Sequence, residues 1–295
     1  MTDKSTWRTL NDGNKIPPIG FGVFMMEPDE CEKATTDALA AGYRLIDTAN
    51  AYMNERAVGR AMRASGLDRS EIFLTTKIMP IDFGYEKTAA AIDSTLARLG
   101  TDYVDLLLLH IRFGDYLGAW RAMEEALDAG KVRSIGFSNF EEPQIRDIYE
   151  HARIMPAVDQ IECHPYFQEH AIRAILAEKD VQVECYYPVG HGDARLFAEP
   201  ALKDIAASHG KSVAQVILRW HVQEGFIPLP KSTNPEHIKA NLDIFDFSLT
   251  DEEMSAIRAL DTDRSYFADN LEGVTEEQHA AMFLNVEHPD YDAQK

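Results

Sequence analysis

The sequence predicts an α/β protein built as a (β/α)8 TIM barrel, and three observations support this prediction. Short apolar runs alternate with longer amphipathic runs along the 295 residues. Eight short runs can be counted, which is the number of strands in such a barrel. Successive runs begin about 25 to 30 residues apart, as strand–helix units do, except before the last run. A doubly wound parallel sheet is the alternative architecture.

The predicted elements follow in chain order. The segment Asn11-Asp12-Gly13-Asn14 lies between two short extended stretches and is typical of a hairpin turn, so a β-hairpin precedes the barrel. The eight expected strands are IGFG near Ile19, RLIDT from Arg44, FLTTKI from Phe73, VDLLLLH from Val104, RSIGFSN from Arg133, AVDQIE from Ala157, VQVECYY from Val181 and FIPLP from Phe226. Helical periodicity covers residues 30–41, 54–65, 86–99, 116–129, 142–151 and 169–179.

The last gap is wider and has room for two helices, over residues 199–208 and 212–223, so one extra helix precedes the last strand. We expect one domain over residues 1–295, with the barrel at about 6–260 and a C-terminal extension at about 261–295.

Composition limits the possible partners. Apolar residues make up 45% and charged residues 26%, as in ordinary globular proteins. The formal net charge of −20 disfavours nucleic acids and anionic membranes as partners. No run approaches the ~18 apolar residues of a membrane helix, and the N-terminus lacks an apolar signal core. We expect a cytoplasmic protein, monomeric or weakly homo-oligomeric.

Cysteines and histidines offer little sign of a metal or of disulfides. Cys31, Cys163 and Cys185 are an odd number of cysteines at wide spacing, which indicates a reducing compartment. Cys163 and His164, with His170, lack the tightly spaced ligand pairs of structural zinc sites. We therefore expect no metal.

Polar residues follow three successive expected strands. Asp47, Lys77 and His110 end the second, third and fourth strands, and Tyr52 lies five residues beyond Asp47. Catalytic residues of barrels come from such strand ends. A lysine ammonium lowers the pKa of a tyrosine, which is about 10 when unperturbed, and an aspartate can hold that lysine. This set suits protonation of a carbonyl oxygen, with a neutral histidine orienting the carbonyl and a cofactor supplying hydride.

Each of these four residues, taken singly, also has a structural explanation. Asp47 can cap a helix, Tyr52 can pack at the rim, Lys77 can be a solvated strand end and His110 can be a core histidine. Their joint order along the chain favours the catalytic interpretation.

Six segments then resemble the aldo-keto reductase family, in order and at matching spacing from about Thr9 to Asp261. Within the family they are most similar to bacterial reductases related to diketogluconate reductase and prostaglandin F synthase. The segments are GYRLIDTANAYMNERAVGRAM from Gly42, LTTKI from Leu74, LLLLH ending at His110, KVRSIGFSNF from Lys131, DQIECHPY from Asp159 and LPKSTNPEHIKANL from Leu229.

The resemblance implies a barrel that binds a nicotinamide cofactor, mostly NADPH, without a Rossmann domain. It implies that Tyr52 is the general acid and that Asp47, Lys77 and His110 complete a tetrad. It also implies that Ser138, Asn139 and Gln160 bind the nicotinamide carboxamide and that Tyr186 stacks on the ring. The residues implied around the adenosine end are Lys231, Ser232, Thr233, His237 and Asn241. For Tyr186 a core aromatic, and for Ser138 and Asn139 a helix cap, remain the alternatives.

The sequence departs from the family pattern in three places. Asp159 stands where asparagine is usual, and a buried carboxylate there needs a partner or a raised pKa. His237 stands where an arginine usually grips the cofactor phosphate, so NADPH is favoured but NADH use is possible. The expected substrate pocket is mostly apolar, and its residues are Phe24, Met53, Met79, Ile111 and Phe113.

We therefore predict NAD(P)H-dependent reduction of an aldehyde or ketone to an alcohol. The alternative is a non-catalytic, nucleotide-binding regulator on the same barrel. A phosphate-handling barrel isomerase is a third possibility, with HGD at His191 and PKST at Pro230 as weak candidates for its phosphate loop.

Overall fold

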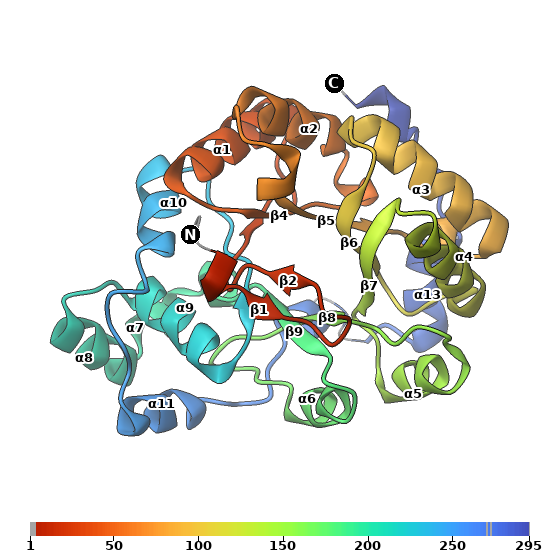
Figure 1. The fold of residues 1–295 in the computed structure, drawn as a ribbon. Helices are drawn as coiled ribbons and strands as arrows, with labels where there is room; N and C mark the ends of the chain where they lie inside the picture. The colour runs from red at the N-terminus through yellow and green to blue at the C-terminus, as the bar shows by residue number, and fades with distance from the viewer. Residues whose placement is uncertain (1–3, 270, 272, 295) are drawn as a thin grey trace.

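The computed structural model describes residues 4–269, 271 and 273–294, and it contains a parallel eight-stranded sheet curled into a barrel (Figure 1). Each strand pairs with the next along the chain, from the first to the eighth. The strands are β3 (Phe21–Gly22), β4 (Leu45–Asp47), β5 (Phe73–Ile78), β6 (Val104–Leu109), β7 (Val132–Ser138), β8 (Val158–Glu162), β9 (Gln182–Tyr186) and β10 (Ile227–Pro228).

Backbone hydrogen bonds connect the first strand to the last. The amide of Gly20 donates to the carbonyl of Pro228 at 3.0 Å, and the amide of Gly22 donates to that of Pro230 at 3.1 Å. The sheet therefore closes, as a barrel requires. The (β/α)8 prediction is confirmed, and the doubly wound alternative is wrong.

Helices surround the barrel and follow the strands in turn (Figure 1). The eight expected helices are present. They are α1 (Pro28–Ala41), α2 (Glu55–Ala64), α3 (Tyr85–Leu99), α4 (Tyr116–Asp128), α5 (Glu142–His151), α6 (His170–Ala177), α8 (Pro200–His209) and α9 (Val213–Glu224). The helix pair before β10 includes the extra helix predicted there.

Further helices lie where no helix was expected. They are α7 (Ala194–Ala198), α10 (Pro235–Leu242), α11 (Asp251–Arg258), α12 (Tyr266–Asp269) and α13 (Glu276–Leu284). Each has at most nine residues. Such a helix has few turns, so its apolar periodicity is hard to distinguish from the surrounding sequence.

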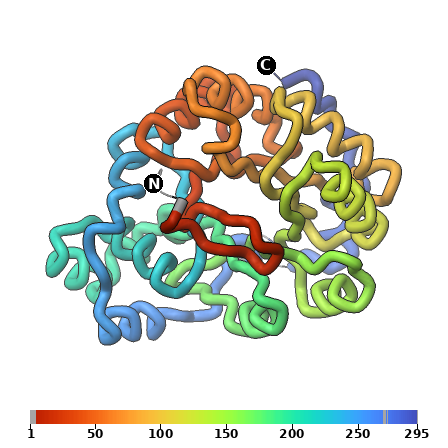
Figure 2. Tube along the Cα trace, viewed as in Figure 1, coloured from red at the N-terminus to blue at the C-terminus, as the bar shows by residue number. Residues whose placement is uncertain are grey.

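The N-terminal hairpin closes one end of the barrel, as Figure 2 shows. Its strands are β1 (Arg8–Thr9) and β2 (Lys15–Ile16), paired antiparallel as predicted. Hairpin residues pack in one apolar cluster with residues that point into the barrel, and the cluster includes Trp7, Leu10, Ile16, Leu45, Phe73, Leu106 and Leu108. This end is filled: a Cβ added at Gly20 would lie 2.2 Å from Cδ2 of Leu45.

Strand alternation then decides which side chains face the opposite end. Leu106 and Leu108 belong to the inner cluster, whereas Leu107 and Leu109 belong to the larger cluster beneath the helices. Because successive residues alternate, Asp47 lies on the same side of β4 as Leu45, and Lys77 lies on the same side of β5 as Phe73. The inner rows thus change from apolar to polar toward the C-terminal ends of the strands.

None of the helices in the described ranges is long and apolar enough to cross a membrane.

Candidate active site

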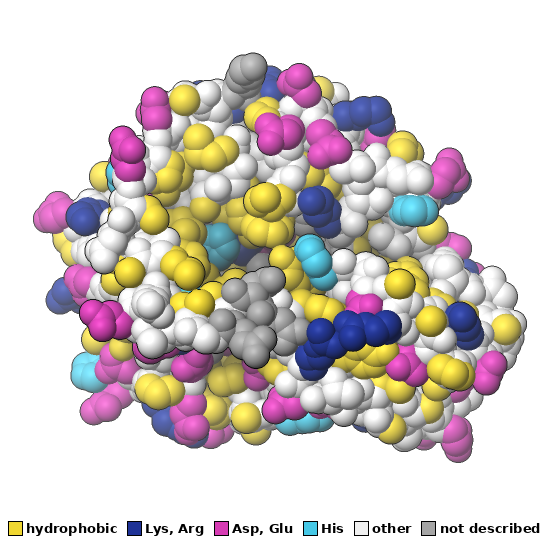
Figure 3. All heavy atoms as spheres, turned by 180° about the vertical axis from the view of Figure 1, so that it is seen from behind, with side chains coloured by type: hydrophobic (Ala, Val, Ile, Leu, Met, Phe, Trp, Pro, Cys, Tyr) yellow, Lys and Arg dark blue, Asp and Glu magenta, His cyan; other side chains and the backbone are white. Residues whose placement is uncertain are grey.

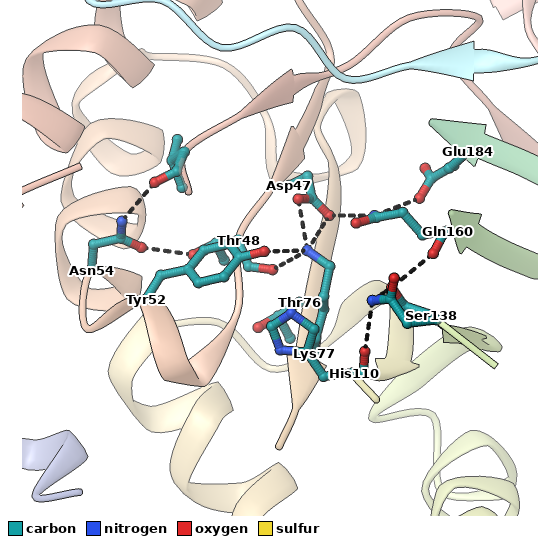
Figure 4. A network of polar contacts seen from close by, with 12 residues as sticks. Asp47, Thr48, Tyr52, Asn54, Thr76, Lys77, His110, Ser138, Gln160 and Glu184 are labelled. Atoms are coloured by element: carbon teal, nitrogen blue, oxygen red, sulfur yellow. Dashed lines mark hydrogen bonds and ion pairs between the residues drawn. The ribbon is translucent and has the colours of Figure 1, made fainter. Parts of the chain in front are cut away.

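Lys77 is the centre of a buried polar network at the C-terminal ends of the strands (Figure 4). Its Nζ donates to both carboxylate oxygens of Asp47 at 2.7 Å and to the carbonyl of Thr48 at 3.0 Å. The same Nζ lies 3.2 Å from the hydroxyl of Tyr52. Strand β4 supplies Asp47, β5 supplies Lys77, and the short 3-10 helix Asn50–Tyr52 carries the tyrosine.

Burial controls the ionisation of this group. It raises the pKa of Tyr52 to about 12, while the Lys77 ammonium opposes that rise. The lysine acts in the direction that the sequence predicted, but desolvation outweighs it. Burial disfavours the Lys77 ammonium as well, yet Asp47 and Tyr52 together more than compensate, and the pKa of Lys77 is raised. At neutral pH the network therefore holds an ammonium and a protonated phenol.

His110 lies beside the tyrosine, with the two ring centroids 5.6 Å apart. Burial and the Lys77 charge hold the pKa of His110 well below its ordinary value, so the imidazole is neutral. Its Nδ1 is buried without a hydrogen-bond partner among the described residues. A neutral imidazole with free hydrogen-bonding capacity suits binding of a polar ligand atom.

Gln160 extends the network to a residue that the sequence analysis missed. Its Nε2 donates to Asp47 at 2.9 Å and to Glu184 at 3.0 Å. Burial, and the nearby Asp47 charge, raise the pKa of Glu184 to about 8. The signal was present in the sequence, because Glu184 interrupts the apolar run of β9 at a position that alternation directs inward.

Ser138, Asn139 and Tyr186 form a second set of contacts next to His110. The Ser138 hydroxyl donates to the carbonyl of Gln160 at 2.7 Å, and Asn139 Nδ2 donates to the carbonyl of His110 at 3.2 Å. The Tyr186 hydroxyl donates to Asn139 Oδ1 at 2.7 Å. Asn139 has a φ of 57°, a conformation that asparagine tolerates better than most residues. The structure thus brings these three together at the ends of β7 and β9.

The residues expected at the adenosine end lie just before α10 and along it. Lys231 and Thr233 are exposed, and Ser232 is half-buried. α10 begins after this segment at Pro235, and the Asn234 side chain caps the amide of Glu236 at 2.9 Å. His237 is exposed, and Asn241, half-buried, follows it one turn later on the same face of α10. The sequence analysis missed this helix.

The predicted pocket residues differ in their burial. Phe24 packs edge-on against Tyr52, with ring centroids 5.1 Å apart, and is exposed. Met53 and Met79 are half-buried, whereas Ile111 and Phe113 are buried. Tyr187, which the sequence analysis missed, lies 6.4 Å from Phe24 between ring centroids. On the face opposite the hairpin, Figure 3 shows a central hollow bordered by hydrophobic and histidine side chains.

Asp159 stands where the family usually has asparagine, and the sequence analysis expected it to be buried. Its side chain is fully buried, and neither carboxylate oxygen has a hydrogen-bond partner among the described residues. Burial raises its pKa well above the ordinary value, with Glu169 adding to the effect. The sequence left open either a partner or a raised pKa for this carboxylate, and the structure has the raised pKa.

A sequence profile of the Aldo/keto reductase family matches residues 18–262. The chain belongs to this family. A morphine 6-dehydrogenase from Pseudomonas putida is 43% identical to it over 276 residues, which cover 89% of this chain and 93% of that protein. This aldo-keto reductase is an NAD(P)H-dependent oxidoreductase, so the non-catalytic regulator and the isomerase are no longer needed as explanations.

Solved structures agree with this assignment. The crystal structure of an aldo/keto reductase from Brucella melitensis superposes on the reductase with a TM-score of 0.84 at 44% identity, over 86% of this chain and 99% of that one. A Bombyx mori aldo-keto reductase, solved in complex with NADP, has a TM-score of 0.84 at 34% identity over 88% of this chain and 94% of that one. The family resemblance seen in the sequence is confirmed.

Glu162 attaches the C-terminal segment of the reductase to the barrel, a role that the sequence analysis missed. Its carboxylate accepts hydrogen bonds from the Ser265 hydroxyl at 2.6 Å and from the amides of Tyr266 and Phe267 at 2.6 and 3.0 Å. His164 contacts the same carboxylate at 2.9 Å. Further along, α13 brings Phe283 into a stack with Phe113, with ring centroids 6.0 Å apart.

We expect Glu162→Gln to loosen this segment. The variant loses the negative charge that binds two backbone amides, and the N–H group of the glutamine can point toward these N–H donors. We expect the free energy of unfolding to fall by about 1.5–3 kcal/mol. Hydrogen–deuterium exchange of residues 265–284 should become faster, and the free energy of unfolding should fall. Unchanged exchange in that segment would show that other contacts hold it.

The matched control is Glu178→Gln, whose carboxylate pairs with Arg146 on the surface. That variant should leave both the exchange rates and the free energy of unfolding close to those of the wild type. Acid should reproduce the loosening in the wild type. Hydrogen bonds to Glu162 outweigh its burial and lower its pKa, so their stabilisation is present above the unfolded-state pKa and is lost as pH falls through the folded-state value.

Proposed function

We propose that this reductase converts an aldehyde or ketone to an alcohol, with Tyr52 as the proton donor. The observation that carries the proposal is the Lys77 ammonium, which bridges the Asp47 carboxylate and the Tyr52 hydroxyl. Tyr52 is protonated at neutral pH because burial raises its pKa to about 12. A carbonyl oxygen that gains negative charge becomes basic enough to take this proton, and Lys77 stabilises the phenolate left behind.

His110 orients the carbonyl in this mechanism. It is neutral, because burial lowers its pKa, so it does not compete as a stronger acid than Tyr52. The hydride comes from the bound nicotinamide, since no side chain donates one. Asp47 does not touch the substrate; it holds the Lys77 ammonium where both functions need it.

The set around His110 fits a nicotinamide. Ser138 and Asn139 offer a hydroxyl and an amide beside Gln160, and a carboxamide takes both donors and acceptors. The Tyr186 ring adjoins the same set through its bond to Asn139. We assign the carboxamide to Ser138, Asn139 and Gln160, and the face of the ring to Tyr186.

The segment before α10 fits the adenosine end of the cofactor. Lys231 supplies a charge, and Ser232 and Thr233 supply hydroxyls. Glu236, in the first turn of α10, repels a phosphate. Because His237 replaces an arginine fork, we infer a preference for NADPH that is weaker than an arginine would give.

This inference predicts the effect of one substitution. His237→Arg should tighten NADPH binding by about 1–2 kcal/mol and leave NADH binding unchanged, so the ratio of NADPH to NADH affinity should rise. Dissociation constants for both cofactors, measured by quenching of protein fluorescence, give the ratio.

The control for this experiment is Lys239→Arg, an arginine introduced two residues further along the same helix. It should leave the ratio unchanged. A His237→Arg protein that binds NADPH no more tightly than the wild type would show that His237 does not face the phosphate.

The substrate class follows from the apolar pocket. Phe24 packs against Tyr52, and the half-buried Met53 and Met79 add adaptable apolar side chains. The Pseudomonas putida relative is named for a bulky polycyclic alcohol, and we propose that this reductase also takes hydrophobic carbonyls. The test follows NADPH and NADH absorbance with aliphatic aldehydes, aryl ketones, polycyclic ketones and sugar-derived dicarbonyls. A preference for the sugar-derived compounds would contradict the proposal.

A further inference from the structure

Two cysteines and a histidine meet on the outer side of the barrel, away from the active site. Cys163 follows β8, Cys185 lies in β9, and His221 comes from α9. One ligand atom of each residue, a sulfur or a ring nitrogen, lies within 4.8 Å of the other two. All three side chains are fully buried. Both cysteines belong to the cluster between the sheet and the helices, so they face away from Gln160 and Glu184.

The two ring nitrogens of His221 have conflicting surroundings. Nδ1 lies 2.8 Å from the carbonyl of Ile217, one turn earlier in α9, and Nε2 lies 3.0 Å from the carbonyl of Cys163. A neutral imidazole carries one N–H and can satisfy one of the two acceptors. The other nitrogen then turns a lone pair toward a carbonyl oxygen, unless a second proton or a metal cation occupies that position.

We propose that Cys163, Cys185 and His221 form a binding site for a thiophilic d10 cation, Cu(I) or Zn²⁺. Thiolate sulfur and imidazole nitrogen are the ligands that these ions prefer. With Nδ1–H donating to the carbonyl of Ile217, Nε2 is the ligand atom. Metal-bound histidines usually have such a carbonyl partner on the second nitrogen.

The spacing of the three atoms suits a metal. With metal–sulfur bonds of about 2.3 Å, two sulfurs on one metal lie about 4 Å apart. The observed limit of 4.8 Å is therefore within reach of small side-chain rotations. Within the part of the chain that the structure describes, the group has three members. This number suits three-coordinate Cu(I) without addition, whereas Zn²⁺ takes four ligands as a rule.

Loading exchanges protons and leaves the sulfurs unoxidised. The cation displaces the two thiol protons, which pass to solvent, and two metal–sulfur bonds form in their place. A disulfide is the competing use of the pair. The register partner of Cys185 is Ile161, two residues before Cys163, which places the two Cα atoms roughly 8 Å apart, beyond ordinary disulfide reach.

The test measures metal retention by the full-length protein. Apo protein, prepared with reductant and chelator, is incubated anaerobically with Cu(I) against a chromophoric Cu(I) chelator, and separately with Zn²⁺ against a chromophoric Zn²⁺ chelator. After desalting, metal per chain is measured by mass spectrometry. We expect about one Cu(I) per chain in the wild type, and at least about tenfold weaker retention in Cys185→Ser and His221→Gln.

Cys31→Ser is the matched control, because Cys31 is also free and buried but lies in α1, outside the group. It should retain metal like the wild type. X-ray absorption of the loaded wild type requires no variant, and it should show two sulfur neighbours and one nitrogen neighbour. One Zn²⁺ with those ligands in place of Cu(I) supports the site with the other ion.

Three results overturn the proposal. The first is a wild type that retains neither ion. The second is a Cys185→Ser protein that retains as much metal as the wild type. The third is a Cys163–Cys185 disulfide, seen by peptide mapping, in the protein as isolated under reducing conditions.

Discussion

Tyr52→Phe is expected to lower turnover by about 10²- to 10⁴-fold, which is the range that general acid–base catalysis contributes. The variant removes one hydroxyl, whose oxygen lies 3.2 Å from Lys77 Nζ. The ring and its edge-on contact with Phe24 remain, so the pocket keeps its shape. Single-turnover rates with NADPH and an aryl aldehyde measure the loss directly.

Cofactor affinity separates loss of the acid from loss of the site. NADPH should bind Tyr52→Phe within a few-fold of wild type, because the residues assigned to the cofactor are unchanged. Tyr116→Phe is the matched control: it removes a hydroxyl that donates to Asp147, outside the network. It should keep wild-type turnover. A well-folded Tyr52→Phe protein that retains substantial reductase activity would remove Tyr52 as the proton donor.

Strand-end residues were the part of the site that sequence alone could predict. A polar residue that ends an apolar run, such as Asp47 or Lys77, combines a local pattern with a general property of barrels. Glu184 interrupts an apolar run and could have been noticed, but its role, like that of Glu162, depends on other strands and on the C-terminal segment, which the sequence does not place. The sequence analysis also missed the proposed metal site, because Cys163 and His221 are far apart in the chain.

Ionisation was harder to predict than position. The sequence placed a lysine near Tyr52 and predicted a lowered pKa, but it could not supply the depth of burial. Desolvation is the larger effect, and it raises the pKa of Tyr52 to about 12. The consequence favours reduction, because the phenol holds its proton across the neutral range. In the reverse direction the same burial makes tyrosinate scarce, so alcohol oxidation should speed up as pH rises.

Lys77→Met is expected to produce the largest loss of stability. Methionine replaces the fully buried lysine with an apolar side chain. Asp47, whose side chain is only 6% exposed, keeps its charge but loses its cation. Removing one partner of a buried ion pair costs about 3–5 kcal/mol. In the wild type the raised pKa of Lys77 gives stability that is complete below the unfolded-state pKa and is lost as pH rises through the folded-state value. Urea unfolding at several pH values measures both effects.

The double variant Lys77→Met/Asp47→Asn separates the ion pair from packing. It removes both charges, keeps similar volumes and leaves an amide beside Gln160, so it should recover most of the stability that Lys77→Met loses. It should not recover activity, because the ammonium beside Tyr52 is still absent. In both variants the pKa of Tyr52 should rise further, and the alkaline increase in alcohol oxidation should shift to higher pH. A pH profile that does not move after Lys77→Met would mean that the lysine and the tyrosine are not coupled, whatever the stability shows.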